Sequence, residues 1–104
     1  MRILSIDPGY ERLGIAIMEK EERSKEVLIY SDCFFTSKSL SHPHRLALVG
    51  KEIERIIQEY KPEALSIETL FFSKNTKTAL FVAEARGVIL YQAAAHNLLV
   101  SEFS

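Results

Sequence analysis

Residues 3–9 read ILSIDPG, and this stretch decides the kind of fold that the chain adopts. Ile3 to Ile6 form a mostly apolar run with the length of a buried strand, and Pro8-Gly9 is a turn signal that ends it. Asp7 stands at the end of this run, where a carboxylate is unfavourable unless it is paired, bound to a metal or exposed to water. The stretch therefore predicts a buried strand that presents an acidic group at its carboxyl end.

The residues that follow predict two more strands, antiparallel to the first. Gly14 to Met18 is a second apolar run, separated from the first by a short polar loop, so a hairpin is expected. Residues 26–36 are rich in aromatic and β-branched side chains and predict a third strand. The charged stretch EKEERSKE, residues 19–26, lies between the second and third runs and predicts a solvated hairpin turn.

The apolar residues then change to a helical period. Between Leu46 and Tyr60 they recur at helical spacing, with charged side chains mostly on the other face. Pro43 suits the first turn of this helix, and Pro62 ends it. Residues 64–68, ALSIE, follow as a fourth strand. A strand, crossover helix and strand in succession favour parallel pairing of the new strand with an earlier one.

A second helix is predicted over residues 76–97, and it is apolar nearly all round. Such a helix is buried between layers or lies in an oligomer interface. Leu98 to Phe103 predicts a fifth strand. The order βββαβαβ therefore predicts an α/β fold with a mixed five-stranded sheet flanked by helices, in a single domain over residues 1–104.

Length and composition exclude several classes of protein. The chain has 104 residues, of which 47% are hydrophobic and 26% charged, which is typical of a globular domain and not of a disordered one. The net charge of -1 by itself predicts no nucleic-acid partner. Residues 1–20 resemble neither a signal peptide nor a membrane span, and Cys33 is the only cysteine, so a cytoplasmic setting is expected. The apolar neighbours of Cys33 predict a buried thiol.

Glu68 ends the fourth strand in the same way that Asp7 ends the first. If the two strands are parallel neighbours, their carboxylates emerge side by side at one edge of the sheet and raise each other's pKa. A divalent cation removes that conflict, and oxygen-only ligands suit magnesium or manganese. The alternative is two strand-end acids that face water, and for Asp7 alone this alternative carries equal weight.

The segment Phe71-Phe72-Ser73-Lys74-Asn75 lies between the fourth strand and the second helix. Two adjacent phenylalanines cannot both point in one core direction, so one ring could be exposed and stack on bases or wedge between them. Lys74 could contact a phosphate, and Asn75 could cap a helix whose N-terminus attracts phosphate. A packed loop with Lys74 in solvent explains the same residues equally well.

Two further features of the helices are notable. Gly87 interrupts the second helix and predicts close packing there, and Arg86 beside it then needs a carboxylate or phosphate partner. His42 and His44 flank Pro43 at the start of the first helix. Because no third nitrogen or sulfur ligand accompanies them, we expect exposed or capping side chains instead of a zinc site.

Together these segments resemble the RuvC family of Holliday-junction resolvases. Ile6-Asp7-Pro8-Gly9 with Gly14 resembles the first-strand motif of the family, and Ile67-Glu68 with the FFSKN stretch at residues 71–75 resembles its second catalytic segment. Residues 79–87 and 100–103 resemble its central helix and the strand that follows. The resemblance covers essentially the whole chain, and the Glu68 segment with FFSKN is its most specific part.

The resemblance implies an RNase H-like core and a magnesium-dependent endodeoxyribonuclease. Such an enzyme resolves four-way DNA junctions in recombination and repair by nicking two strands symmetrically. Asp7 and Glu68 would be two of four acidic residues that hold two magnesium ions, for which manganese can substitute. The helix from Thr76 to Asn97 would form a homodimer interface, and a branch-migration helicase is a further candidate partner.

The resemblance also implies residues that bind DNA. Phe71 would stack on bases at the junction centre, with Phe72 beside it as a second candidate. Lys74 and Asn75 would contact the DNA backbone near the scissile bond, and Arg86 is a candidate for a phosphate contact.

The family's other two acids lie on a helix after the fifth strand, so the resemblance predicts a domain truncated at its C-terminus. Half of the metal site and the following helices would then be missing, and one apolar face would be uncovered. Two alternatives therefore stay open. One is a noncatalytic junction-binding or dimerisation remnant, and the other is a YqgF-like nuclease, which shares the fold but lacks the FFSKN pattern. Magnesium-dependent cleavage of a labelled junction separates an enzyme from a remnant.

Overall fold

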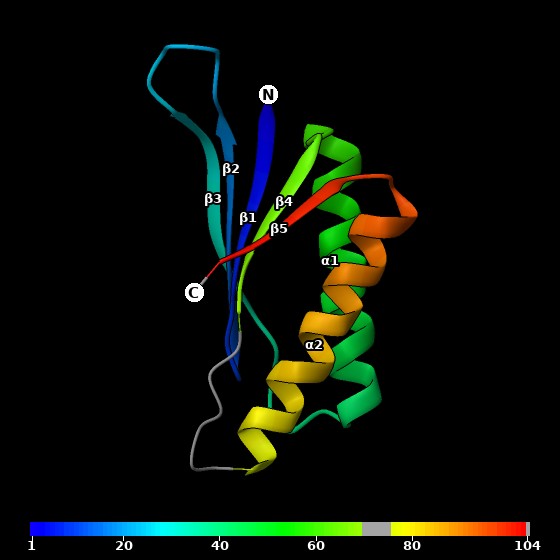
Figure 1. Cartoon of the computed structure of the whole chain (residues 1–104). Helices are drawn as coiled ribbons and strands as arrows, with labels where there is room; N and C mark the ends of the chain where they lie inside the picture. Colours follow the sequence, from blue (N-terminus) through cyan, green and yellow to red (C-terminus); the bar gives the residue numbers. More distant parts are fainter. Residues whose placement is uncertain (70–75, 104) are drawn as a thin grey trace.

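The computed structural model describes residues 1–69 and 76–103, which form one sheet with two helices against it (Figure 1). In chain order the elements are β1 (Arg2–Pro8), β2 (Arg12–Glu19), β3 (Val27–Phe35), α1 (His42–Tyr60), β4 (Ala64–Glu68), α2 (Thr76–Ala95) and β5 (Leu99–Phe103). This order confirms the βββαβαβ succession predicted from the sequence. Neither helix in the described part of the chain is at once long enough and apolar enough to span a bilayer.

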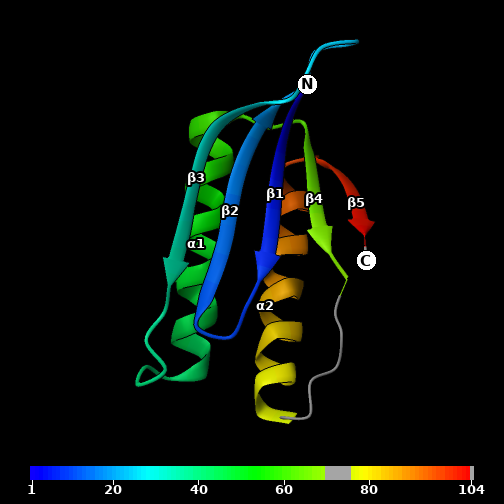
Figure 2. The ribbon, with the colours of Figure 1, turned by 90° about the vertical axis from the view of Figure 1, so that its left-hand side faces the viewer.

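The strands lie in the order β3-β2-β1-β4-β5, so β1 is central (Figure 2). β2 is antiparallel to both β1 and β3, whereas β4 runs parallel to β1 and to β5. The change of direction follows from the connections, because a hairpin reverses the chain while a crossover helix carries it back to the same end of the sheet. The predicted mixed sheet is confirmed.

A single hydrophobic core lies between the sheet and the two helices. Leu4 and Ile6 of β1 and Leu65 and Ile67 of β4 are buried, and they pack with Ile53 of α1, whose exposed fraction is 0%. Burying each such side chain stabilises the fold by about 1.5–3 kcal/mol. Because strand side chains alternate between faces, the intervening residues of the strands lie on the face away from the helices.

Helix α1 begins and ends where the sequence predicts. The Oγ of Ser41 accepts a hydrogen bond from the backbone N–H of His44 at 3.3 Å, and Pro43 lies in the first turn. At the other end, Lys61 has a φ of 50° and donates its N–H to the carbonyl of Ile57. This left-handed residue caps the helix directly before Pro62.

Helix α2 buries only one of its apolar faces. Its buried stripe has a four-residue spacing and consists of Phe81, Ala85, Ile89 and Ala93. The side chains of Leu80 and Tyr91 are 59% and 69% exposed. Two explanations were predicted for a helix that is apolar nearly all round: burial between layers, and an oligomer interface. Burial against the sheet explains the buried stripe, but it does not explain the exposed apolar side chains.

Both helices lie on one face of the sheet, and the other face is not covered by any described residue (Figure 1). The prediction that Cys33 is buried is wrong, because the thiol is exposed. β3 is an edge strand in which Phe34 turns toward the core, so Cys33, its neighbour, faces the open side opposite Gly14.

Candidate functional site

Two carboxylates meet where β1 and β4 end. Ile6 of β1 and Ile67 of β4 are register partners in a parallel pair, so Asp7 and Glu68 follow one residue later on adjacent strands. Both isoleucines point into the core, and alternation therefore puts both carboxylates on the open face of the sheet. The prediction that these two strands run alongside each other and bring the two acids together is confirmed.

The two carboxyl groups interact directly. The pKa of Glu68 is raised above its ordinary value, first because its carboxyl group shares a hydrogen bond with that of Asp7. Repulsion between the two negative charges and partial desolvation raise it further. A cation between the two carboxylates would relieve this repulsion.

Small residues leave the space beside Asp7 open. Its register partner in β2 is Gly14, and a Cβ there would lie 3.3 Å from the Cβ of Asp7. A Cβ at Gly9 would come within 2.5 Å of the carbonyl oxygen of Arg12, so the turn after Asp7 accepts only glycine without moving. A hollow of about 390 Å³ adjoins these residues. No bulky side chain therefore stands beside the carboxylate of Asp7 on the side of β2.

Arg86 of α2 joins the ends of β4 and β5. Its Nη2 lies 2.5 Å from Oε1 of Glu102, and its Nε donates to the backbone carbonyl of Glu68 at 3.4 Å. Of the two predicted kinds of partner for Arg86, carboxylate or phosphate, the structure shows a carboxylate, while a DNA contact by Arg86 stays a prediction. The prediction of close packing at Gly87 is wrong for the described residues, because a Cβ at Gly87 would have none of their atoms within 4 Å. The face of α2 that carries Gly87 points away from the sheet.

Four of the predicted DNA-binding residues lie outside the described residues: Phe71, Phe72, Lys74 and Asn75.

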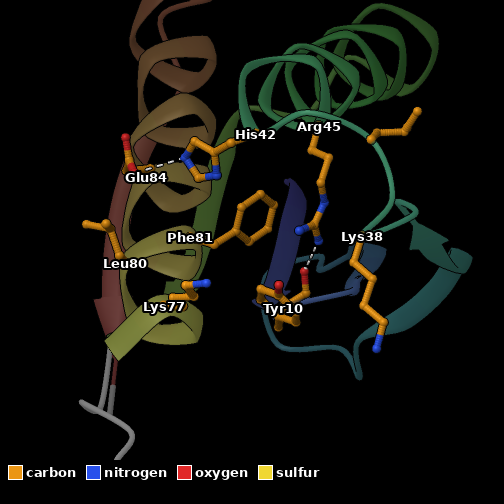
Figure 3. Close-up of a pocket in the computed structure, with 9 residues that line it drawn as sticks. Tyr10, Lys38, His42, Arg45, Lys77, Leu80, Phe81 and Glu84 are labelled. Carbon is orange, nitrogen blue, oxygen red and sulfur yellow. Dashed lines mark hydrogen bonds and ion pairs between the residues drawn. The ribbon is translucent and has the colours of Figure 1, made fainter. Parts of the chain in front are cut away.

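A buried arginine that the sequence analysis did not single out lies beyond the turn after Asp7. The side chain of Arg45 is 4% exposed, and its guanidinium lies 3.9 Å from the centroid of the Phe81 ring and 4.8 Å from that of Tyr10 (Figure 3). Its Nε donates to Oγ1 of Thr36 at 3.2 Å, and its Nη2 donates to the carbonyl of Tyr10. The sequence contained a sign of this burial, because Arg45 precedes Val49 by one helical turn and so lies on the apolar face of α1.

The two histidines at the start of α1 are exposed, as expected. Nε2 of His42 lies 2.9 Å from Oε1 of Glu84, so this side chain joins the first turn of α1 to α2. Within residues 1–69 and 76–103, no group of three or more His, Cys, Asp or Glu side chains is arranged to hold a metal ion. The candidate metal site therefore consists here of Asp7 and Glu68 alone.

Comparison with known proteins gives a consistent result. The family model described as "Crossover junction endodeoxyribonuclease RuvC" matches residues 3–104. Curated relatives of that name from Fusobacterium nucleatum and Alkaliphilus oremlandii are 39% and 43% identical to the whole chain. The chain spans 54% and 63% of their lengths.

The fold gives the same answer. The solved structure described as "T. thermophilus RuvC in complex with Holliday junction substrate" superposes with a TM-score of 0.90 at 24% identity, over 99% of this chain and 65% of that one. At this identity the likeness shows the fold, and it confirms the predicted RNase H-like core. Because the family model matches nearly every residue, the chain belongs to the RuvC family of crossover junction endodeoxyribonucleases.

Proposed function

We propose that this chain carries part of the active site of a structure-specific endodeoxyribonuclease, which cleaves four-way DNA junctions in recombination and repair. The observation that carries the proposal is the pairing of Asp7 with Glu68 on adjacent parallel strands. The names of the curated relatives and the junction-bound RuvC from T. thermophilus support the same substrate. A cytoplasmic location belongs to this proposal.

The carboxylate pair suits a hard divalent cation. It offers oxygen donors only, and the charge of Asp7 raises the pKa of Glu68, so Mg²⁺, or Mn²⁺ in its place, would relieve their repulsion. Asp7 and Glu68 would hold the metal, and a complete two-ion site would take two more acids. When bound, such ions activate a water molecule and stabilise the leaving oxygen of a phosphodiester.

The residues of this chain would prepare that chemistry in three ways. Glu68 and Asp7 would hold the cation, whose charge would offset the repulsion that raises the pKa of Glu68. Gly14 leaves room beside Asp7 for a phosphodiester backbone. Arg86 fixes the end of β4 through the carbonyl of Glu68, so it acts as a positioning residue.

DNA binding is assigned to the segment between β4 and α2. In this proposal Phe71, with Phe72 beside it, stacks on bases, and Lys74 and Asn75 contact the backbone. Support comes from the position of the segment in the sequence, because it directly follows the strand that ends at Glu68. Arg86 would add a phosphate contact only if its pairing with Glu102 opened.

A homodimer is part of the same proposal. The exposed side of α2 presents Leu80, Gly87, Tyr91 and Ala94, which recur at helical spacing and form one stripe. Large apolar side chains on an otherwise polar surface mark interaction sites. The helix from Thr76 to Asn97 would therefore pair with its copy, which brings two active sites to one junction. A branch-migration helicase is a further candidate partner.

Cleavage of a labelled four-way junction in Mg²⁺ tests the function. We expect nicking by a full-length form that has all four acids, and by its Glu54→Gln variant, a control that removes an exposed carboxylate of α1. Glu68→Gln should abolish nicking and leave junction binding largely intact. If that full-length form binds junctions without nicking them, the noncatalytic module is the correct function. The RuvC family match favours either function over the YqgF-like nuclease.

A further inference from the structure

We propose that a pocket on the helix side of the turn after β1 binds a phosphate group through Arg45. The pocket has a volume of about 290 Å³ and lies among the turn after β1, the segment before α1 and the first turns of both helices. Arg45 and Phe81 form its inner wall, and Tyr10, Lys38 and Lys77 surround its opening (Figure 3). It is distinct from the carboxylate pair, which lies on the opposite face of the sheet.

The first argument is the charge of Arg45. Arg45 is only 4% exposed. Its two hydrogen-bond acceptors, Oγ1 of Thr36 and the carbonyl of Tyr10, are both neutral. No carboxylate of the described residues lies within ion-pair distance of it. A buried charge is unfavourable without a counterion, and the faces of Phe81 and Tyr10 compensate it only in part. A guanidinium has five N–H donors, so an anion at its edge would complete the site.

The second argument is the charge around the opening. Lys38 and Lys77 lie on either side of the pocket in Figure 3. The side chain of Lys38 is 70% exposed, and its Nζ lies 3.1 Å from Oε1 of Glu11. The one acidic side chain that lines the pocket, Glu84, is bonded to Nε2 of His42 at 2.9 Å. Because Lys38 is already paired with Glu11, the positive charge that the pocket offers to a ligand is mainly that of Arg45. The planar guanidinium fork matches the oxygens of a phosphate.

The third argument is position. The turn after β1 and the N-termini of α1 and α2 all lie at the same end of the molecule (Figure 2). Helix N-termini carry partial positive charge, which adds to the attraction for an anion. Tyr10 follows Asp7 by three residues, so a DNA strand could lie with one phosphate at Arg45 and another near the carboxylate pair. The assignment of this phosphate to DNA rests on the proposed function. The inference that the pocket binds a phosphate group does not.

The test is a titration of the ¹⁵N-labelled chain followed by NMR in EDTA, so that no divalent metal takes part. Sodium phosphate, a short DNA duplex and sodium chloride at matched ionic strength are added in separate experiments. We expect saturable shifts of the Arg45 Nε–Hε signal and of the Tyr10 amide with phosphate and with DNA, and none with chloride. In Lys38→Gln/Lys77→Gln these shifts should be lost or strongly weakened. Lys25→Gln/Lys51→Gln removes the same charge elsewhere and should behave like the unmodified chain.

The salt dependence of DNA binding gives a second measurement. Losing one phosphate contact should reduce the slope of log K against log salt by about one in the pocket variant and leave it unchanged in the control. Phosphate binding without any DNA effect would support the site and assign it to a small phosphate ester. The proposal is overturned if neither ligand gives saturable shifts, or if the pocket and control variants respond alike.

This outcome is independent of the nuclease assignment. Glu68→Gln retains every residue of the pocket, so it should bind phosphate as the unmodified chain does. A chain that binds phosphate at Arg45 but never nicks a junction would contradict the proposed function alone. Loss of the phosphate response with intact nicking would contradict the pocket alone.

Discussion

Asp7 and Glu68 each stand one residue beyond a buried isoleucine, and those two isoleucines are register partners across parallel strands. Ile67 has no exposed surface and Ile6 only 2%. A slip of one residue in either strand would turn its isoleucine out of the core and its carboxylate into it. The hydrophobic core therefore sets the alignment of the two acids, although neither acid contributes to the core.

The carboxylate pair should make the metal-free chain less stable at higher pH. The pKa of Glu68 is raised in the folded state, so the folded chain binds the proton of Glu68 more tightly than the unfolded chain does. Stability is therefore gained as pH falls through the folded pKa, and the gain is complete below the unfolded pKa. Thermal unfolding in EDTA over a pH series measures this effect. Glu68→Gln should be more stable than the unmodified chain above the folded pKa, and Glu54→Gln should follow the unmodified chain.

Magnesium should stabilise the folded chain through the same pair. At a free concentration of ten times its Kd, a ligand that binds only the folded state adds about 1.4 kcal/mol. In a domain of this size, each kcal/mol of added stability raises the Tm by roughly 4–8 °C. Differential scanning fluorimetry should show this rise with MgCl₂ and not with KCl at equal ionic strength. An equal rise in Asp7→Asn/Glu68→Gln would place the magnesium elsewhere.

Two glycines of the helices should respond differently to alanine. Gly87 has open space around it, so Gly87→Ala should stabilise the monomer by about 0.5–1 kcal/mol through helix propensity. Gly50 is buried, and a Cβ there would lie 3.2 Å from Cγ1 of Val88. Gly50→Ala gains the same helix propensity but must displace the side chain of Val88, so it should be less stable than Gly87→Ala. Urea unfolding measures both variants, and equal stabilisation by the two would contradict the packing described for α1 and α2.

The exposed stripe of α2 should control self-association. Tyr91→Glu places a charge on the stripe, so it should shift the chain from dimer to monomer in sedimentation equilibrium. Gln58→Glu adds the same charge to an exposed position of α1 and should leave the association constant unchanged. Dimerisation that survives Tyr91→Glu unaltered would assign the interface to another surface.

Local patterns in the sequence were enough to predict the order of the helices and strands and the proximity of Asp7 to Glu68. Alternation and helical periodicity report which residues of one element share a face, and Pro43 and Pro62 bound α1 by their own chemistry. Asp7 and Glu68 could be paired because both end apolar strands joined through a crossover helix, whose connection makes the strands parallel.

Only the tertiary structure decided how single side chains are surrounded. Cys33 is exposed because β3 is at the edge and its outer face is open, and Gly87 is exposed because α2 turns that side outward. Arg45 is buried because Phe81, thirty-six positions later in the sequence, closes over it. The physical reason is that periodicity specifies faces within an element, whereas burial depends on which distant elements cover each face.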